Sequence, residues 1–217
     1  HRDLHSFPTR RSSDLAMAQG MQFLILGWLV LEISSSSYQL GLVIFAFGLP
    51  SMFFALLGGI IADRADRIKL LISTRFCVSV LIFALAALRI FDLLEIWHVY
   101  TIVLLLGVIQ GLNGPARMAV VPDLVDRDGI SNAIALHSMV HQTGQIIGPA
   151  VAGGIIELAG IGPTLLVNGG LYLSGIVFLI LIRGLPSRTG SGKVRVLEDF
   201  RAGLRCIRET PVLYTVI

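Results

Sequence analysis

Two carboxylates stand at the ends of long apolar stretches of this sequence, where an acid could carry protons. Glu32 follows the apolar run Phe23–Leu31, and Glu157 separates two stretches without charged residues. An acid inside a membrane is a candidate proton relay, because its charge is costly to bury there. Both residues lie near the ends of their apolar runs, so we favour hydrated carboxylates at the membrane surface. Glu32 stays a candidate for proton transfer.

A second set of polar side chains falls inside the apolar stretches. His137 and His141 are four residues apart and would share one face of a helix. They could bind a metal, line a cavity or pack near a helix end; we favour packing, since no third ligand or supporting acid is near. No metal or other cofactor is predicted. The amides that could line a polar cavity are Gln110, Asn113, Gln142 and Gln145.

The composition places these residues in a membrane protein. Of 217 residues, 54% are hydrophobic and 14% are charged, whereas soluble domains carry roughly 25% charge. Residues 34–62, 96–116, 129–156 and 158–182 contain no Asp, Glu, Lys or Arg, and a run of about 18 such residues can cross a bilayer as a helix. The pattern excludes a soluble enzyme, a nucleic-acid-binding domain and a disulfide-stapled secreted module, since the only cysteines are Cys77 and Cys206.

Six membrane-spanning helices must position the polar groups. The apolar runs are too long for barrel strands and do not alternate with period two, so the sequence predicts an all-α, polytopic six-helix bundle. A seventh span would begin at residues 211–217. The six expected helices are Ala16–Ile33, Gln39–Ala62, Leu70–Leu88, Trp97–Leu112, Ala133–Ile156 and Pro163–Ile182.

The basic residues predict the orientation of the bundle. After residue 15, every Lys and Arg except Arg89 falls on the side reached after an even number of spans. Cytoplasmic loops are enriched in these residues, so we expect both ends of the six-helix unit to be cytoplasmic. The net charge of +3 is then explained by topology and predicts no nucleic-acid partner.

The first fifteen residues differ from the rest. They read HRDLHSFPTRRSSDL, which is polar and basic and lacks the apolar centre of a signal peptide. When it is reverse-translated into DNA, the segment resembles a widely used sequencing adapter. We therefore expect residues 1–15 to be an artefact of sequence assembly and the natural first helix to be longer; a natural basic tail is the alternative.

Residues 183–210 form the only long polar segment that follows. It starts with Gly, Ser and Pro and then becomes periodic, which predicts an amphipathic helix in a cytoplasmic central loop. The helix could lie on the membrane surface or pack on the ends of the bundle. Its apolar face would hold Leu197, Phe200, Leu204 and Ile207, and its basic face Arg201, Arg205 and Arg208.

A glycine, an acid and three basic residues stand between the second and third spans. Gly59 would permit a close helix approach, and Asp63 at the membrane boundary needs a cation or a helix N-terminus as partner. The order Gly59, Asp63, Arg64, Arg67 and Lys69 resembles the signature of the major facilitator superfamily, with Asp66 in place of the usual turn glycine. An ordinary positive-inside loop would explain the basic residues but not this order. The resemblance implies a loop that switches between conformations.

Further motifs resemble the bacterial enterobactin-exporter and macrolide-efflux branch of that superfamily. They are Gly27–Glu32, Leu40–Leu42, Asn113–Arg117, Pro122–Val125 and Asn132–Leu136. The resemblance implies a proton-driven exporter of a drug, siderophore or metabolite, which works by alternating access in a bacterial inner membrane. Residues 16–182 would be its N-terminal bundle, and six further helices would follow. The alternatives are an importer or lipid flippase of the same fold and, less favoured, a membrane subunit that does not transport.

The fifth span carries a run of small residues around a proline. Gly144, Gly148, Pro149 and Gly153 resemble the antiporter signature of the superfamily, although the spacing to the last glycines is one residue longer. Glycines four apart permit close helix packing, and a proline bends a helix by freeing a carbonyl group. Generic helix packing is the alternative. The arginine that drug antiporters of this superfamily usually carry before Gln110 in the fourth span is absent.

Overall fold

The computed structural model describes residues 7–64, 67–124 and 130–181, which form six α-helices. All regular secondary structure in these ranges is helical, so the predicted all-α class is confirmed. The predicted central loop and the start of a seventh span lie outside the described residues. The helices are α1 (Phe7–Ser34), α2 (Ser37–Arg64), α3 (Arg67–Ile90), α4 (Ile96–Leu124), α5 (Ile130–Ala159) and α6 (Ile161–Leu181).

Two predicted helix boundaries differ by more than three residues from those in the structure. Helix α1 begins at Phe7 rather than Ala16, although its apolar part starts only at Asp14. Helix α4 continues to Leu124, so the predicted end at Leu112 is wrong. The segment that follows contains Pro115, which removes one backbone hydrogen bond; the helix runs on through it.

Length and composition are compatible with membrane spans. Among the described residues, four helical stretches are long and apolar enough to cross a bilayer, and a fifth, Ile161–Val177, is apolar but shorter. The four are Asp14–Ser34, Ser37–Gly59, Lys69–Ile90 and Ile96–Arg117.

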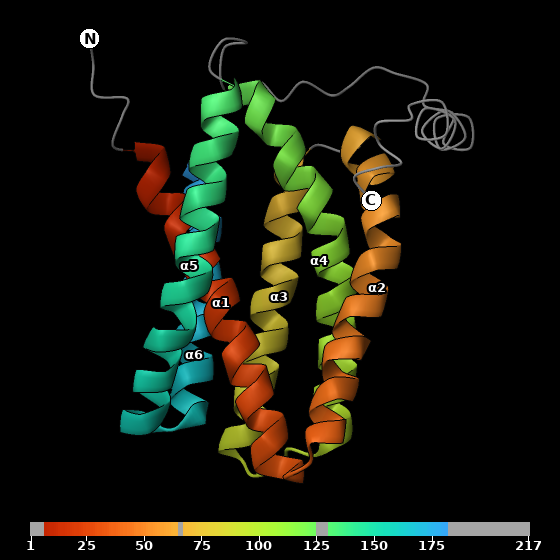
Figure 1. The fold of residues 1–217 in the computed structure, drawn as a ribbon, viewed down its shortest axis with the longest axis vertical. Helices are drawn as coiled ribbons and strands as arrows, with labels where there is room; N and C mark the ends of the chain where they lie inside the picture. Colours follow the sequence, from red (N-terminus) through yellow and green to blue (C-terminus); the bar gives the residue numbers. More distant parts are fainter. Residues whose placement is uncertain (1–6, 65–66, 125–129, 182–217) are drawn as a thin grey trace, which may run out of the picture.

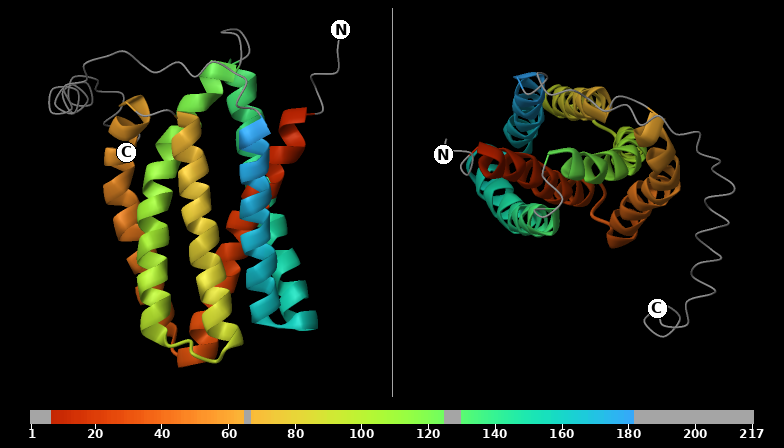
Figure 2. Two further views of the ribbon diagram at one scale, coloured as in Figure 1. Left: turned by 180° about the vertical axis from the view of Figure 1, so that it is seen from behind. Right: turned by 90° about the horizontal axis from the view of Figure 1, so that it is seen from above.

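The helices run up and down, but neighbours in sequence are not the main neighbours in space. The most extensive contacts join α2 with α4, α1 with α5 and α3 with α6. Figures 1 and 2 show α1 against α5 and α6 on one side of the bundle and α2 against α4 on the other. Each main pair thus joins a helix from the first three to a helix from the last three.

Glycine makes the α1–α5 contact possible. A Cβ atom added at Gly148 would overlap the carbonyl oxygen of Met17 and lie 2.8 Å from the nitrogen of Met21. At Gly144 it would overlap Ala16, and at Gly20 it would lie 2.9 Å from the carbonyl oxygen of Gly144. The two backbones therefore touch directly, as small residues allow between membrane helices.

The α2–α4 contact is built in the same way. A Cβ atom at Gly111 would lie 2.5 Å from the carbonyl oxygen of Ser51, and one at Gly107 would overlap that of Phe47. From the other side, a Cβ atom at Gly58 would lie 2.7 Å from the carbonyl oxygen of Gly111. Both long helix pairs therefore depend on backbone-to-backbone contact.

Tight turns join the helices at the end of the bundle that carries the α1–α2 connection. Each turn holds one residue in the left-handed region: Ser35 (φ 50°), Asp92 (φ 54°) and Gly160 (φ 85°). A left-handed residue within the first two positions after a helix is a common way to end it. We call this end of the bundle the α1–α2 end; it is at the bottom of Figure 1.

Candidate functional site

A polar cavity of about 240 Å³ lies between five of the helices. Five of its seven lining side chains carry an amide or a phenol, and the other two are phenylalanines. All lining residues come from the middle parts of their helices. The cavity is lined by Gln19, Gln22 and Phe23 of α1, Phe47 of α2, Gln110 of α4, Gln145 of α5 and Tyr172 of α6.

A chain of hydrogen bonds ties this cavity to Arg117. The Nη1 of Arg117 donates to the Oε1 of Gln19 at 3.3 Å, and the Nε2 of Gln19 donates to the Oε1 of Gln110 at 3.3 Å. Because a guanidinium can only donate, the oxygen of Gln19 must face Arg117 and its nitrogen must face Gln110. This order turns the amide nitrogen of Gln110 away from Gln19.

Helix α6 fixes the other wall of the cavity. The hydroxyl of Tyr172 donates to the Oε1 of Gln22 at 2.5 Å, and the Nδ2 of Asn168 donates to the carbonyl oxygen of Ala18 at 2.8 Å. Both bonds are buried and join α1 to α6. The bond from Tyr172 occupies the oxygen of Gln22, so its amide nitrogen is the group left to donate.

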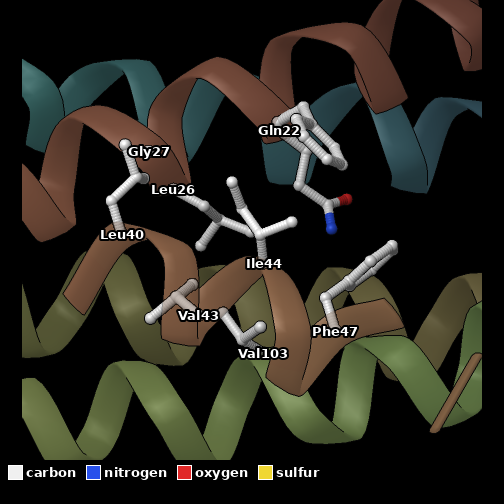
Figure 3. Close-up of a pocket in the computed structure, with 9 residues that line it drawn as sticks. Gln22, Leu26, Gly27, Leu40, Val43, Ile44, Phe47 and Val103 are labelled. Atoms are coloured by element: carbon white, nitrogen blue, oxygen red, sulfur yellow. The ribbon is translucent and has the colours of Figure 1, made fainter. Parts of the chain in front are cut away.

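An apolar groove adjoins the polar cavity and shares three of its lining residues, Gln22, Phe23 and Phe47. The rings of Phe23 and Phe47 meet edge to face with their centroids 6.0 Å apart. In Figure 3 the amide of Gln22 lies on the same side of the groove as Phe47, and aliphatic side chains fill the rest. The other lining residues are Leu26, Gly27, Leu40, Val43, Ile44 and Val103.

Two arginines lie inside the bundle near the cavity. Arg75 of α3 donates from Nη1 to the carbonyl oxygen of Gly175 at 3.0 Å, and its buried Nε has no acceptor among the residues that the structure describes. Neither Arg75 nor Arg117 forms an ion pair with any residue that the structure describes. Both arginines lie close enough to Tyr172, in the cavity wall, to interact with its side chain electrostatically. The region beside the cavity is therefore positively charged.

The amides predicted from the sequence fall into two groups. Gln110 and Gln145 both line the polar cavity. Asn113 is buried on α4, and its Oδ1 has no donor among the described residues. His141 lies one turn before Gln145 on α5 and is half-buried; it is not part of the cavity lining. The side chain of His137 lies outside the described residues.

The two carboxylates lie at the α1–α2 end and not in the central cavity. Glu32 accepts a hydrogen bond from Arg89 at 2.7 Å, and Arg89 also binds Asp92 at 2.9 Å. Glu157 lines an open groove between α1, α3, α5 and α6, together with Glu32, Arg89 and Gly153. Both carboxylates are exposed in the described structure.

The residues of the α2–α3 connection are only partly described. Helix α2 ends at Arg64 and α3 begins at Arg67, but the side chains of Asp63, Arg64 and Arg67 lie outside the described residues. Lys69 is exposed in the first turn of α3.

The close helix approach predicted at Gly59 is wrong for the described part of the chain. A Cβ atom at Gly59 would meet nothing within 4 Å, whereas Gly58 touches the backbone of α4. Adjacent residues point about 100° apart on a helix, so one position decides which glycine faces the partner.

The predicted glycines of α5 differ in their surroundings. Gly144 and Gly148 lie where the backbones of α1 and α5 touch, and Pro149 stands beside Gly20 in the same contact. A Cβ atom at Gly153 would meet only the side chain of Leu24 at 3.9 Å, which is an ordinary contact.

The sequence analysis does not single out five side chains that lie at or beside the cavity: Gln19, Gln22, Arg75, Arg117 and Tyr172. The spacing of Gln19 and Gln22 puts two amides on one face of an apolar helix, which was a usable signal. Arg75 and Arg117 entered the sequence analysis only through the count of cytoplasmic basic residues. Their position in the sequence indicates how far along a helix they lie, but not the direction in which their side chains point.

Comparison with known proteins places the chain in a family. The family model described as transmembrane secretion effector matches residues 15–217. The staphyloferrin A transporter of Staphylococcus aureus is 28% identical over 71% of this chain and 39% of its own length. The multidrug efflux pump Tap of Mycolicibacterium fortuitum is 28% identical over 91% of this chain and 50% of its own length. The enterobactin exporter EntS of Escherichia coli is 26% identical over 82% of this chain and 42% of its own length. The chain thus spans half or less of the length of these relatives. It belongs to the transmembrane secretion effector family of the major facilitator superfamily.

Proposed function

We propose that this chain is the N-terminal half of a transporter that exports a small molecule from the cell. The observation that carries the proposal is the polar cavity at the middle of a six-helix bundle of this family. The names of similar proteins, an enterobactin exporter and a multidrug efflux pump, support export as the direction. The substrate would bind between this bundle and a second six-helix bundle.

Alternating access requires that each bundle move as a rigid body. The backbone contacts of Gly148 with α1 and of Gly111 with α2 support such rigidity, because interfaces at this distance cannot slide without a clash. The loop from Gly59 to Lys69 would then stabilise one of the two arrangements, through contacts made only in that state.

Proton coupling is part of the proposal, and Glu32 is its candidate. Its carboxylate is paired with Arg89 at the α1–α2 end, which would face the outside. Protonation removes the charge that holds this pair. A proton arriving from outside could in this way release α1 from α3, while the substrate occupies the central cavity. Gln110, Asn113, His141 and Gln145 remain candidate cavity residues for the substrate.

The orientation yields a direct prediction about topology. The α1–α2 end carries Arg89 as its single Lys or Arg among the described residues, so it would be external, and both ends of the unit would face the cytoplasm of a bacterium. Alkaline phosphatase and fluorescent-protein fusions report the two sides. Fusions after Asp66, Asp128 and Ser191 should read cytoplasmic, and those after Ser36, Leu93 and Gly160 external. An external signal after Asp128 would contradict the six-span arrangement.

Efflux from living cells tests the function. The full-length gene product, expressed in a host that lacks its own pumps, should lower the accumulation of at least one member of a panel of drugs and siderophores. A protonophore should abolish the difference. Residues 1–217 expressed alone should not transport, because they would supply only one wall of the cavity. Accumulation equal to the empty vector for every compound, at confirmed expression, would rule out the exporter within that panel's chemistry.

A further inference from the structure

The polar cavity presents hydrogen-bond donors to its interior. In the hydrogen-bond chain from Arg117 through Gln19 to Gln110, the side-chain oxygens of both glutamines accept a hydrogen bond. The amide nitrogen of Gln110 is therefore left to donate. The oxygen of Gln22 is likewise occupied by the hydroxyl of Tyr172. In the part of the chain that the structure describes, neither the amide nitrogen of Gln110 nor that of Gln22 has an acceptor. Such a wall binds groups that accept hydrogen bonds.

Charge strengthens the same preference. Among the described residues the cavity lining contains no Asp or Glu, and two arginines, Arg75 and Arg117, act on Tyr172 in its wall. Neither is neutralised by an ion pair with a described residue, and both lie among the membrane-spanning helices, where a charge interacts over a longer range than in water. An anion placed in the cavity would be attracted to both, and a cation would be repelled.

The rest of the site is apolar and aromatic. The groove next to the polar cavity is walled by aliphatic side chains, and Phe23 and Phe47 stand at the border between the two parts. Figure 3 shows the amide of Gln22 and the ring of Phe47 pointing toward the same space, with Val43 and Ile44 beyond. One ligand could therefore touch donors at one end and an apolar wall at the other.

We propose that this site selects amphipathic organic anions. The anionic or acceptor-rich group would lie against Gln19, Gln22 and Gln110, within the field of Arg117, and an apolar ring or chain would lie against Phe23 and Phe47. The inference rests on the proposed function, since it names the substrate class of the same cavity. It is tested by binding, which needs no gradient and no transport.

Two aromatic probes that differ by one anionic sulfonate group give the sharpest test. Anilinonaphthalene sulfonate is an aromatic anion, and phenylnaphthylamine is the same aromatic body without the sulfonate. Their affinities for the purified full-length protein would be measured by fluorescence titration, with the detergent signal subtracted. The wild type should bind the anion at least about tenfold more tightly than the neutral probe, as one charge-assisted hydrogen bond allows. Equal affinities, or tighter binding of the neutral probe, would overturn the inference without any variant.

Three variants locate the preference. Arg117→Gln should weaken anion binding roughly 10- to 100-fold and leave neutral binding unchanged. Arg117→Lys keeps the charge and should retain most of the preference. Lys193→Gln removes an equal charge in the predicted central loop and should change neither affinity. Anion binding that falls equally in Arg117→Gln and Lys193→Gln would show a general charge effect and overturn the assignment.

The apolar end has its own variant. Phe47→Ala should weaken the binding of both probes by a similar factor, because each would lose the same aromatic contact.

If Arg117→Gln does not fold, Gln110→Glu tests the preference for anions by placing a negative charge in the cavity. It should reverse the preference toward the neutral probe. An unchanged preference in a folded Gln110→Glu protein would overturn the proposed site. Efflux measured in parallel separates the two ideas: loss of anion selectivity with normal efflux contradicts only the substrate class.

Discussion

Gly148→Ala should sharply lower the amount and the stability of folded protein. The new methyl group would overlap the carbonyl oxygen of Met17 and approach the nitrogen of Met21 to 2.8 Å. Both are backbone atoms, so no rotamer change can relieve the clash, and α1 and α5 must separate. Overpacking of this kind costs about 1–3 kcal/mol and sometimes more. The loss would spread, because α1 also carries the hydrogen bonds to Tyr172 and Asn168 of α6.

The effect is measured on the full-length protein as a fluorescent-protein fusion, by the monodisperse fraction in size-exclusion chromatography and by the thermal midpoint. Gly170→Ala is the matched control, since a Cβ atom at Gly170 of α6 meets nothing within 4 Å. In a helix that substitution should be neutral or slightly stabilising. If Gly148→Ala and Gly170→Ala had the same midpoint, the α1–α5 backbone contact would not contribute to the fold as described.

Asp63→Asn should abolish most transport while the protein still folds and inserts. The substitution keeps the shape of the side chain and removes its charge, and a charge-assisted hydrogen bond is about twice as strong as a neutral one. If the partner of Asp63 is met only when the cytoplasmic side is closed, the variant shifts toward the inward-open state. A coupling of about 1–3 kcal/mol would change the ratio of the two states roughly 5- to 150-fold.

Two measurements check this prediction together: the efflux rate and the accessibility, from the cytoplasmic side, of cysteines placed in the cavity. Asp66→Asn is the matched control, because it removes a carboxylate from the same loop at a position where the superfamily signature has glycine. It should change neither quantity. Unchanged accessibility and unchanged efflux in Asp63→Asn would reduce Asp63 to a topology residue.

The helices were predictable from sequence because their signal is local. An uncharged stretch of sufficient length specifies a span wherever it lies, and all six predicted spans correspond to helices. The end of α4 was not predictable in this way. Gly114 and Pro115 are typical of a helix end in water, but membrane helices tolerate such residues when neighbouring groups satisfy the backbone. The helix therefore continues to Leu124.

The cavity was predictable only in part, because it depends on the direction in which each side chain points. Gln110 and Gln145 stood out as amides in mid-span, and both line the cavity. Asn113 was equally prominent, yet it is buried on α4 and does not line that cavity. The choice between Gly58 and Gly59 was of the same kind, since it required knowing which face of α2 meets α4. Rotation about the helix axis is set by tertiary packing, which one sequence does not reveal.

The pairing of α1 with α5 also sets the order in which the chain can assemble during synthesis. At about 5–20 residues per second, a ribosome makes Gly148 roughly 6–26 s after Gly20. Until then, α1 has no α5 beside it, and Tyr172, the partner of Gln22, is made later still. The amide of Gln22 would have to be accommodated by lipid headgroups, water or the insertion machinery. Helices should therefore leave the site of insertion as a group, and the bundle should close only when α6 arrives.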